Sequence, residues 1–383
     1  MPSVFIKTFG CQANKSDSER ILGDYLARGF TETNSWREAA EIVLNTCSVR
    51  QSAEDRVRGF LLNLNKYLLE TGKTKPKVIL TGCMLHFNEK ELKELLPEID
   101  EILPIAEVGF NQKVIRKDKL NAWVPISTGC NSFCTYCIVP FSRGREKSRS
   151  EADILLEVAD LVKQGYKFIN LLGQNVNSYG LEKSGITLRK LYMDKENFQE
   201  SSIPSNESQY FRPTDTPPFV QLLQKISAIN GVEKITFFTS NPWDFWDELI
   251  DEIAVNLKID RFIHLPVQSG SNRILKLMNR GYTRESYLSL VDRIRAKVPN
   301  VVFGTDIIVG FPGETDADFA DTLDLVKRVG FKVAFVARYS PRPGTASFKL
   351  YPDDVPAKVK KERWEILDQI ANKDNLSVRP LIP

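Results

Sequence analysis

The chain has 383 residues, a length that suggests two or three domains with sizeable cores. Hydrophobic residues make up 42% of it and charged residues 26%, as in ordinary globular proteins, and the net charge of +3 neither requires nor excludes a nucleic-acid partner. The sequence shows no apolar run of membrane-spanning length and no signal peptide, so we expect a cytosolic protein without a membrane partner.

Three apolar segments in the N-terminal third each end at a cysteine. Predicted strands at 4–8, 42–45 and 77–81 are followed by Cys11, Cys47 and Cys83. Predicted helices alternate with them at about 16–27, 53–70 and 89–96, and Ser16 is the expected N-cap of the first. Strands alternating with helices indicate a doubly wound parallel sheet, in which ligands bind beyond the carboxyl ends of the strands.

The three cysteines are therefore expected to converge in space. One alternative is that they are buried structural cysteines, because free cysteine is commonly buried. A second alternative is a zinc site, because His86 follows Cys83 by three residues and would complete a set of three cysteines and one histidine.

From residue 119 onward the sequence predicts six β/α units. This is two units short of a complete eight-stranded barrel, so we expect a partial (β/α)6 barrel over residues 119–383 after an N-terminal domain over 1–118. A polar segment at 181–218 interrupts the pattern and is interpreted as a mobile surface insertion. The predicted strands are 123–127, 168–172, 234–239, 261–265, 301–309 and 333–339, and the predicted helices 151–164, 219–229, 245–256, 284–297, 316–329 and 357–375.

Polar turns follow five of these strands and favour a ligand pocket over a set of unrelated turns. Glycine in such turns allows a ligand to approach the backbone closely. Candidate pocket residues are Gln174, Asn175, Ser240, His264, Gln268, Gly310, Gly313 and Glu314.

The turn after the first barrel strand carries the strongest motif. Residues 129–137 read GCNSFCTYC, so Cys130, Cys134 and Cys137 have C-x3-C-x2-C spacing with Tyr136 before the last thiol. Three thiolates this close together can hold an iron–sulfur cluster, and three ligands leave one iron of a four-iron cluster open. In a long cytosolic chain such cysteines are more often metal ligands or reactive groups than disulfides.

This motif, in its barrel context, resembles the radical S-adenosylmethionine (SAM) superfamily. The resemblance implies that Cys130, Cys134 and Cys137 are catalytic and hold a 4Fe-4S cluster whose open iron chelates SAM, and that Tyr136 lies beside the adenine. It also implies that electron transfer cleaves SAM to a 5′-deoxyadenosyl radical. Gln174, Asn175, Ser240, Gln268 and the 310–314 turn are then candidate contacts to SAM.

The N-terminal motifs 8–14 (TFGCQAN), 45–50 (NTCSVR) and 81–84 (TGCM) are similar to those of the methylthiotransferase family. The resemblance implies a second, auxiliary 4Fe-4S cluster on Cys11, Cys47 and Cys83. Residues 143–149, 172–180 and 264–270 favour the branch that adds a methylthio group to C2 of N6-isopentenyladenosine beside the tRNA anticodon. Sister branches modify N6-threonylcarbamoyladenosine of tRNA or an aspartate of a ribosomal protein, and a rival of another class is a non-catalytic RNA-binding protein stabilised by zinc or a cluster.

The implied partners are the tRNA anticodon stem-loop and an electron donor such as flavodoxin or ferredoxin, and we expect a monomer. Two basic sets are candidates for phosphate contacts, with a solvated basic face as the alternative. The family normally ends in a C-terminal RNA-binding TRAM domain, and this sequence stops where that domain is expected to begin. Either the sequence is a fragment or the protein binds RNA without that domain, and we expect weaker tRNA binding than in relatives that carry it. The basic residues are Arg143, Arg145, Lys147 and Arg149, and Arg273, Lys276 and Arg280.

Overall fold

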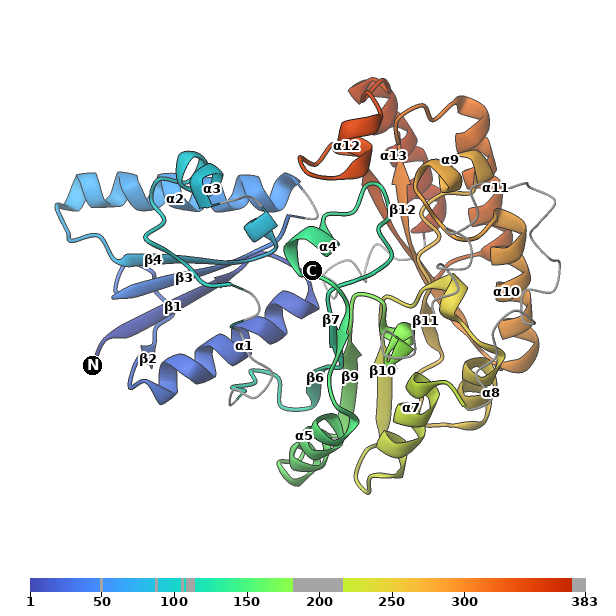
Figure 1. Cartoon of the computed structure of the whole chain (residues 1–383), viewed down its shortest axis with the longest axis horizontal. Helices are drawn as coiled ribbons and strands as arrows, with labels where there is room; N and C mark the ends of the chain where they lie inside the picture. The colour runs from blue at the N-terminus through green and yellow to red at the C-terminus, as the bar shows by residue number, and fades with distance from the viewer. Residues whose placement is uncertain (49–50, 87–88, 105–106, 108–113, 182–215, 374–383) are drawn as a thin grey trace. The chain divides into compact units, whose positions relative to one another are not determined.

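The computed structural model describes residues 1–48, 51–86, 89–104, 107, 114–181 and 216–373 (Figure 1). The chain forms two compact units, the first comprising Met1–Lys119 with Cys137–Arg145 and the second comprising Leu120–Tyr136 with the chain from Glu146 on. The predicted insertion at 181–218 lies almost entirely outside the described residues. Within the described ranges, no helix is long and apolar enough to span a membrane.

The first unit is a parallel sheet with strand order β2-β1-β3-β4-β5. This is the doubly wound arrangement in which the chain reverses direction across the sheet between β1 and β3, as the sequence predicted. The strands are β1 (Ser3–Thr8), β2 (Thr31–Glu32), β3 (Glu41–Thr46), β4 (Lys77–Gly82) and β5 (Glu101–Ile102), and the helices are α1 (Gln12–Ala27), α2 (Gln51–Thr71), the 3-10 turn η1 (Cys83–His86), α3 (Glu89–Leu95) and α4 (Val139–Ser142).

Alternation along the central strands divides the core of this unit into two layers. Ile42 and Leu44 pack with α2 and α3, whereas Val43 between them packs with α1 on the opposite face. Figure 1 shows α1 on one side of the sheet and α2 and α3 on the other. Burial on both faces explains why these strands are continuous apolar runs and do not alternate with polar residues.

The predicted start of the first helix is wrong. Helix α1 begins at Gln12, with Cys11 as the residue before it, and Ser16 is fully buried inside the helix and does not cap it. The expected N-cap at Ser16 identified the helix but placed its start about one turn late.

Among its described residues, the second unit has six parallel barrel strands in two hydrogen-bonded sets, β6-β9-β10 and β11-β12-β13. A parallel bridge between Ile235 and Ile259 continues the order from β10 toward β11. The partial six-stranded barrel is therefore confirmed. Its strands are β6 (Asn121–Pro125), β9 (Phe168–Leu172), β10 (Lys234–Phe237), β11 (Phe262–His264), β12 (Val302–Val309) and β13 (Val333–Arg338), and its helices are α5 (Glu151–Lys163), α7 (Pro218–Ala228), α8 (Asp247–Val255), α10 (Arg284–Lys297), α11 (Asp316–Val329) and α13 (Ala357–Ala371).

Several short elements of this unit were not predicted. The antiparallel pair β7 (Ser127–Thr128) and β8 (Lys147–Ser148) brackets the cysteine motif, and α9 (Asn272–Leu277) and α12 (Ala346–Leu350) lie in connections after β11 and β13. Elements this short carry too little periodicity to be recognised in the sequence.

Candidate metal centres and cofactor site

The three cysteines of the first unit follow neighbouring strands of the sheet. Thr46 at the end of β3 pairs with Gly82 at the end of β4, so Cys47 and Cys83 are the next residues of adjacent strands. Cys11 follows β1, the neighbour of β3 on its other side. Cys11 and Cys47 thus lie on the two sides of the topological switch point, where ligands bind in sheets of this order.

Two buried asparagines connect the turns that carry Cys11 and Cys47. Asn14 donates from Nδ2 to Oδ1 of Asn45 (2.8 Å) and to the carbonyl of Thr46 (2.9 Å). Asn45 donates in return to the carbonyl of Asn14 (2.7 Å). Cys11 Sγ lies 3.4 Å from Asn14 Oδ1. These reciprocal bonds fix the cysteine turns to each other because buried amides require hydrogen-bond partners.

A buried arginine contacts the third cysteine. Arg143, in the segment after Cys137, donates from Nε to Cys83 Sγ (3.3 Å) and from Nη2 to Asp17 Oδ2 (2.8 Å). Burial lowers the pKa of Arg143, but the charges of Asp17, Cys83 and Cys11 outweigh burial and raise it well above its usual value. A permanently charged donor on a thiol sulfur favours the thiolate form that binds metal.

In the second unit, the loop that carries Cys130 and Cys134 is held by the chain around residues 277–279. Thr135 donates from its backbone N–H to the carbonyl of Met278 (3.0 Å) and from its hydroxyl to that of Leu277 (2.8 Å). Cys130 and Cys134 are buried, and burial raises the pKa of the Cys130 thiol to about 11. A proton on Cys130 must therefore be displaced by something that stabilises its thiolate, as a metal does.

Tyr136 packs against an apolar cluster formed by Ile274, Met278, Phe311 and Tyr339. These residues come from α9 and from the segments after β12 and β13, so the aromatic ring is held by the carboxyl-end side of the barrel. The position of Tyr136 beside the adenine of SAM stays a prediction.

Arg280 lies beside Cys134, and its nitrogens have well-defined partners. It donates from Nη1 to Cys134 Sγ (3.2 Å), from Nε to the hydroxyl of Tyr282 (2.9 Å) and from Nη2 to the carbonyl of Pro266 (3.1 Å). Its guanidinium carbon lies 4.9 Å from the ring centroid of Trp243. The predicted phosphate contact of Arg280 is therefore wrong, because its guanidinium group is hydrogen-bonded within the second unit.

A buried polar cluster joins the turns after β9 and β10. Asn175 donates from Nδ2 to Asp244 Oδ2 (3.1 Å), and Asn177 exchanges two hydrogen bonds with the backbone of Asn241 (2.7 and 2.9 Å). Burial raises the pKa of Asp244 to about 6, against the opposing effect of Asn175. The Asn175 Oδ1 and Ser240 Oγ atoms are buried without a hydrogen-bond partner among the described residues. Such acceptors suit a polar ligand.

Asp244 was not identified from the sequence. It lies seven residues beyond the end of β10, behind Pro242, where an acidic residue reads as the start of the following helix. Only the fold shows that its side chain returns to Asn175.

Two residues after neighbouring strands adopt left-handed backbone conformations that are unusual without glycine. Thr239 after β10 has φ +63° and Gln268 after β11 has φ +70°. The Thr239 N–H donates to His264 Nδ1 (3.1 Å), and Gln268 pairs with β12 through backbone bonds to Asp306 and Ile308. Strained conformations of this kind gather at functional sites. His264 has a structural role here, with its Nε2 also 3.1 Å from Asp306 Oδ2.

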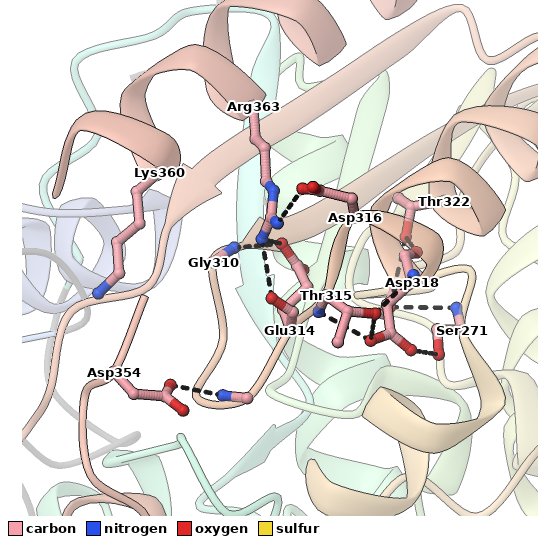
Figure 2. Close-up of polar contacts among 12 residues, drawn as sticks. Ser271, Gly310, Glu314, Thr315, Asp316, Asp318, Thr322, Asp354, Lys360 and Arg363 are labelled. Atoms are coloured by element: carbon pink, nitrogen blue, oxygen red, sulfur yellow. Dashed lines mark hydrogen bonds and ion pairs between the residues drawn. The ribbon is translucent and has the colours of Figure 1, made fainter. Parts of the chain in front are cut away.

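Hydrogen bonds within the second unit hold the turn after β12 in place (Figure 2). Glu314 accepts from the Gly310 N–H (2.8 Å) and from Arg363 of α13 (2.7 Å), and burial raises its pKa despite both contacts. Gly313 donates to Asp354 (2.7 Å). The Glu314 carboxylate is thus used to shape the turn, and contact of the 310–314 turn with SAM remains a prediction.

Each set offers three cysteine thiols, the type of ligand that iron–sulfur clusters take. No three cysteine, histidine or acidic side chains in the described ranges are placed to hold one ion. In a four-iron cluster each cysteine binds a different iron, so the sulfurs stand farther apart than the ligands of a single ion. None of the six cysteines forms a disulfide, and Cys83 and Cys134 each accept a hydrogen bond from arginine. The side chain of His86, on which the zinc alternative depends, lies outside the described residues.

The basic segment 143–149 is not a uniform charged surface. Arg143 and Arg149 have side chains only 5% exposed and are paired with Asp17 and Glu157, so neither is available to phosphate and that prediction is wrong for both. Arg145 and Lys147 are exposed. In the second set, Arg273 is half exposed and pairs with Asp318.

Family models match both units. Residues 124–326 match the radical SAM superfamily, and residues 3–104 match an uncharacterised family designated UPF0004. The barrel with its cysteine motif therefore defines a radical SAM enzyme, a class that uses SAM and a 4Fe-4S cluster.

Curated relatives show which family within this class the chain belongs to. The chain is 42% identical over 97% of its length to the tRNA-2-methylthio-N(6)-dimethylallyladenosine synthase of Thermotoga petrophila, 82% of which is covered. It is 41% identical over 96% of its length to the enzyme of the same name from Desulforamulus reducens, with 79% covered. The chain belongs to this family of radical SAM methylthiotransferases.

Solved structures support the fold alone. The radical SAM methyltransferase TsrM from Kitasatospora setae aligns over 91% of this chain and 74% of its own, with a TM-score of 0.58 and 13% identity. The cobalamin-dependent SAM radical enzyme OxsB aligns over 98% of this chain and 56% of its own, with a TM-score of 0.54 and 13% identity.

Proposed function

We propose that this protein adds a methylthio group to C2 of N6-isopentenyladenosine (also called N6-dimethylallyladenosine) next to the anticodon of tRNA. The proposal is carried by the match over nearly the whole chain to synthases of that name, together with two cysteine trios that form no disulfide. Cys130, Cys134 and Cys137 hold the cluster that binds SAM, and Cys11, Cys47 and Cys83 hold an auxiliary cluster. When bound, the first cluster would supply the electron that cleaves SAM to the radical. A radical is needed because an unactivated aromatic C–H gives a general base little to act on.

The protein's own residues bind and orient the ligands and exclude water from the site. Asn175 and Ser240 offer unpartnered buried acceptors to a polar ligand, while Tyr136 offers an apolar face. Asn14 and Asn45 hold the Cys11 and Cys47 turns together. Rigid positioning is what such a reaction requires from the protein, since misplacement by about 1 Å can cost a hundredfold in rate.

The test combines metal analysis with product analysis. We expect about eight irons per anaerobically reconstituted chain, four for each cluster. With SAM, a reductant and tRNA that carries N6-isopentenyladenosine, nucleoside mass spectrometry should show the methylthio group in place of one hydrogen. Replacing Cys130, Cys134 and Cys137 with alanine should abolish formation of 5′-deoxyadenosine.

Replacing Cys11, Cys47 and Cys83 provides the complementary control. That variant should still cleave SAM but should not form the methylthio product, because only the auxiliary site is lost. Modification of N6-threonylcarbamoyladenosine would contradict the substrate, and zinc in place of iron in the N-terminal site would contradict the reaction.

A further inference from the structure

We propose that Arg280 sets the reduction potential of the cluster bound at Cys134, by holding a buried positive charge and an N–H donor against that ligand sulfur. The inference rests on the proposed function, because it takes Cys134 as an iron ligand. Arg280 is a positioning residue in this scheme, and it acts through the sulfur of Cys134 without touching the substrate.

The guanidinium of Arg280 is fixed in direction. Each of its three nitrogens donates a hydrogen bond, and one of them is directed at Cys134 Sγ at 3.2 Å. Its central carbon also lies within 4.9 Å of the Trp243 ring centroid and 5.1 Å of that of Tyr282. Arginine remains charged at every accessible pH, so the sulfur faces a permanent cation.

The charge of Arg280 is not cancelled by its contacts. These are a sulfur, a hydroxyl, a carbonyl and two aromatic rings, and none of them is a carboxylate. Arg143 on Cys83 provides the contrast, because its Nη2 forms an ion pair with Asp17. Arg280 therefore places a positive charge at the Cys134 sulfur with no carboxylate among its own contacts, whereas the charge of Arg143 beside Cys83 is paired with Asp17. The Glu146 carboxylate of this unit acts on Cys130.

Reduction adds one electron to the cluster, supplied by a low-potential one-electron carrier or by dithionite, and no bond to the protein forms or breaks. The added negative charge is stabilised by a cation close to the ligand sulfur, most strongly in a buried environment of low dielectric constant. Hydrogen bonds to cluster sulfurs act in the same direction. Arg280 thus makes the cluster easier to reduce. Reduction is the step that must precede SAM cleavage.

The experiment is an anaerobic redox titration of the reconstituted chain, monitored by electron paramagnetic resonance. The signal that changes when SAM is added identifies the SAM-binding cluster. For Arg280→Gln we expect the equilibrium constant for reduction to fall about tenfold or more, a potential about 59 mV more negative for one electron. Arg280→Lys keeps the charge and should shift the potential less.

Arg293→Gln is the matched control. Arg293 is a half-exposed arginine of α10 that pairs with Asp247, so its removal should leave the potential unchanged. An unchanged potential in Arg280→Gln, or equal shifts in the Gln and Lys variants, would overturn the inference while leaving the proposed function intact. Wild-type protein that binds no cluster would contradict both.

A second measurement avoids any dependence on the folding of the variant. Wild-type protein labelled with ¹⁵N-arginine should show ¹⁵N coupling in the electron–nuclear double resonance spectrum of the reduced SAM-binding cluster. The coupling supports the contact even if Arg280→Gln fails to load iron, and its absence overturns it.

Discussion

Replacing Arg363 with methionine should destabilise the second unit strongly. Arg363 of α13 donates to the Glu314 carboxylate (2.7 Å) and to the Glu314 carbonyl (3.1 Å), and it also reaches Asp316 Oδ1 (2.7 Å). Figure 2 shows Arg363 reaching both Glu314 and Asp316. Methionine fills similar apolar space but supplies no donor.

The magnitude follows from burial. The Glu314 side chain is 2% exposed and that of Arg363 is 7% exposed, so removing the guanidinium leaves a buried carboxylate with only the Gly310 N–H. Breaking a buried pair in this way costs roughly 3–5 kcal/mol. Asp316 is 99% exposed, so Asp316→Ala should cost less than about 1 kcal/mol and serves as the control.

The pH dependence has a definite sign. Burial already raises the pKa of Glu314 in the folded protein, and loss of Arg363 raises it further. The stability lost in Arg363→Met should therefore be greatest where Glu314 is ionised and should shrink as the pH falls through the pKa of the folded carboxyl.

Urea unfolding of the full chain, followed by hydrogen exchange of peptides from α13 and from the 310–314 turn, reports on this unit separately from the first. The double variant Arg363→Met/Glu314→Gln should lose less than the sum of the two single variants, by more than about 1 kcal/mol, because the buried charge is gone. Equal losses for Arg363→Met and Asp316→Ala, or strict additivity, would refute the reasoning.

Two further predictions concern single buried positions. Since burial raises the pKa of Asp244 from 3.8 to about 6, its favourable contribution to stability is complete below the lower value and lost as the pH rises through the higher one. Asp244→Asn should therefore be more stable than wild type by roughly 3 kcal/mol above that range and no more stable below it, and a pH-independent difference in urea unfolding would count against this pKa. Gly82→Ala should cost more than about 2 kcal/mol and lower the iron content of the N-terminal site, because at φ +92° a Cβ would lie 2.3 Å from the carbonyl oxygen of Thr46. Gly72→Ala, at φ +63° with open space around it, is the control, and equal losses of stability would show that the contact with Thr46 is unimportant.

The elements that carry the fold were largely readable from the sequence. The predicted bounds of β9, α10 and α11 are those observed, because each is a long or fully buried segment between clear turn and capping signals. The positions of the cysteines just after strands or in one tight turn could also be read from the sequence, because spacing and strand ends are local properties, and the role of all six as cluster ligands stays a prediction.

The positions of charged groups were decided by tertiary structure. Arg143, Arg149 and Arg280 look in the sequence like surface cations, but the fold buries them against Cys83, Glu157 and Cys134, respectively. In sequence these pairs are 60, 8 and 146 residues apart, and local patterns carry no information about such contacts.

Local sequence patterns also predict which residues follow a strand, but they do not predict what the side chains of those residues contact. Hydrophobic periodicity and strand ends place Asn175 and Ser240 at the carboxyl edge of the barrel, since backbone direction alone determines which residues follow a strand. Whether a side chain there faces a ligand or a partner in the protein depends on packing. The partners of the buried carboxylates of Glu314 and Asp244, which are Arg363 and Asn175, are therefore determined by the tertiary structure.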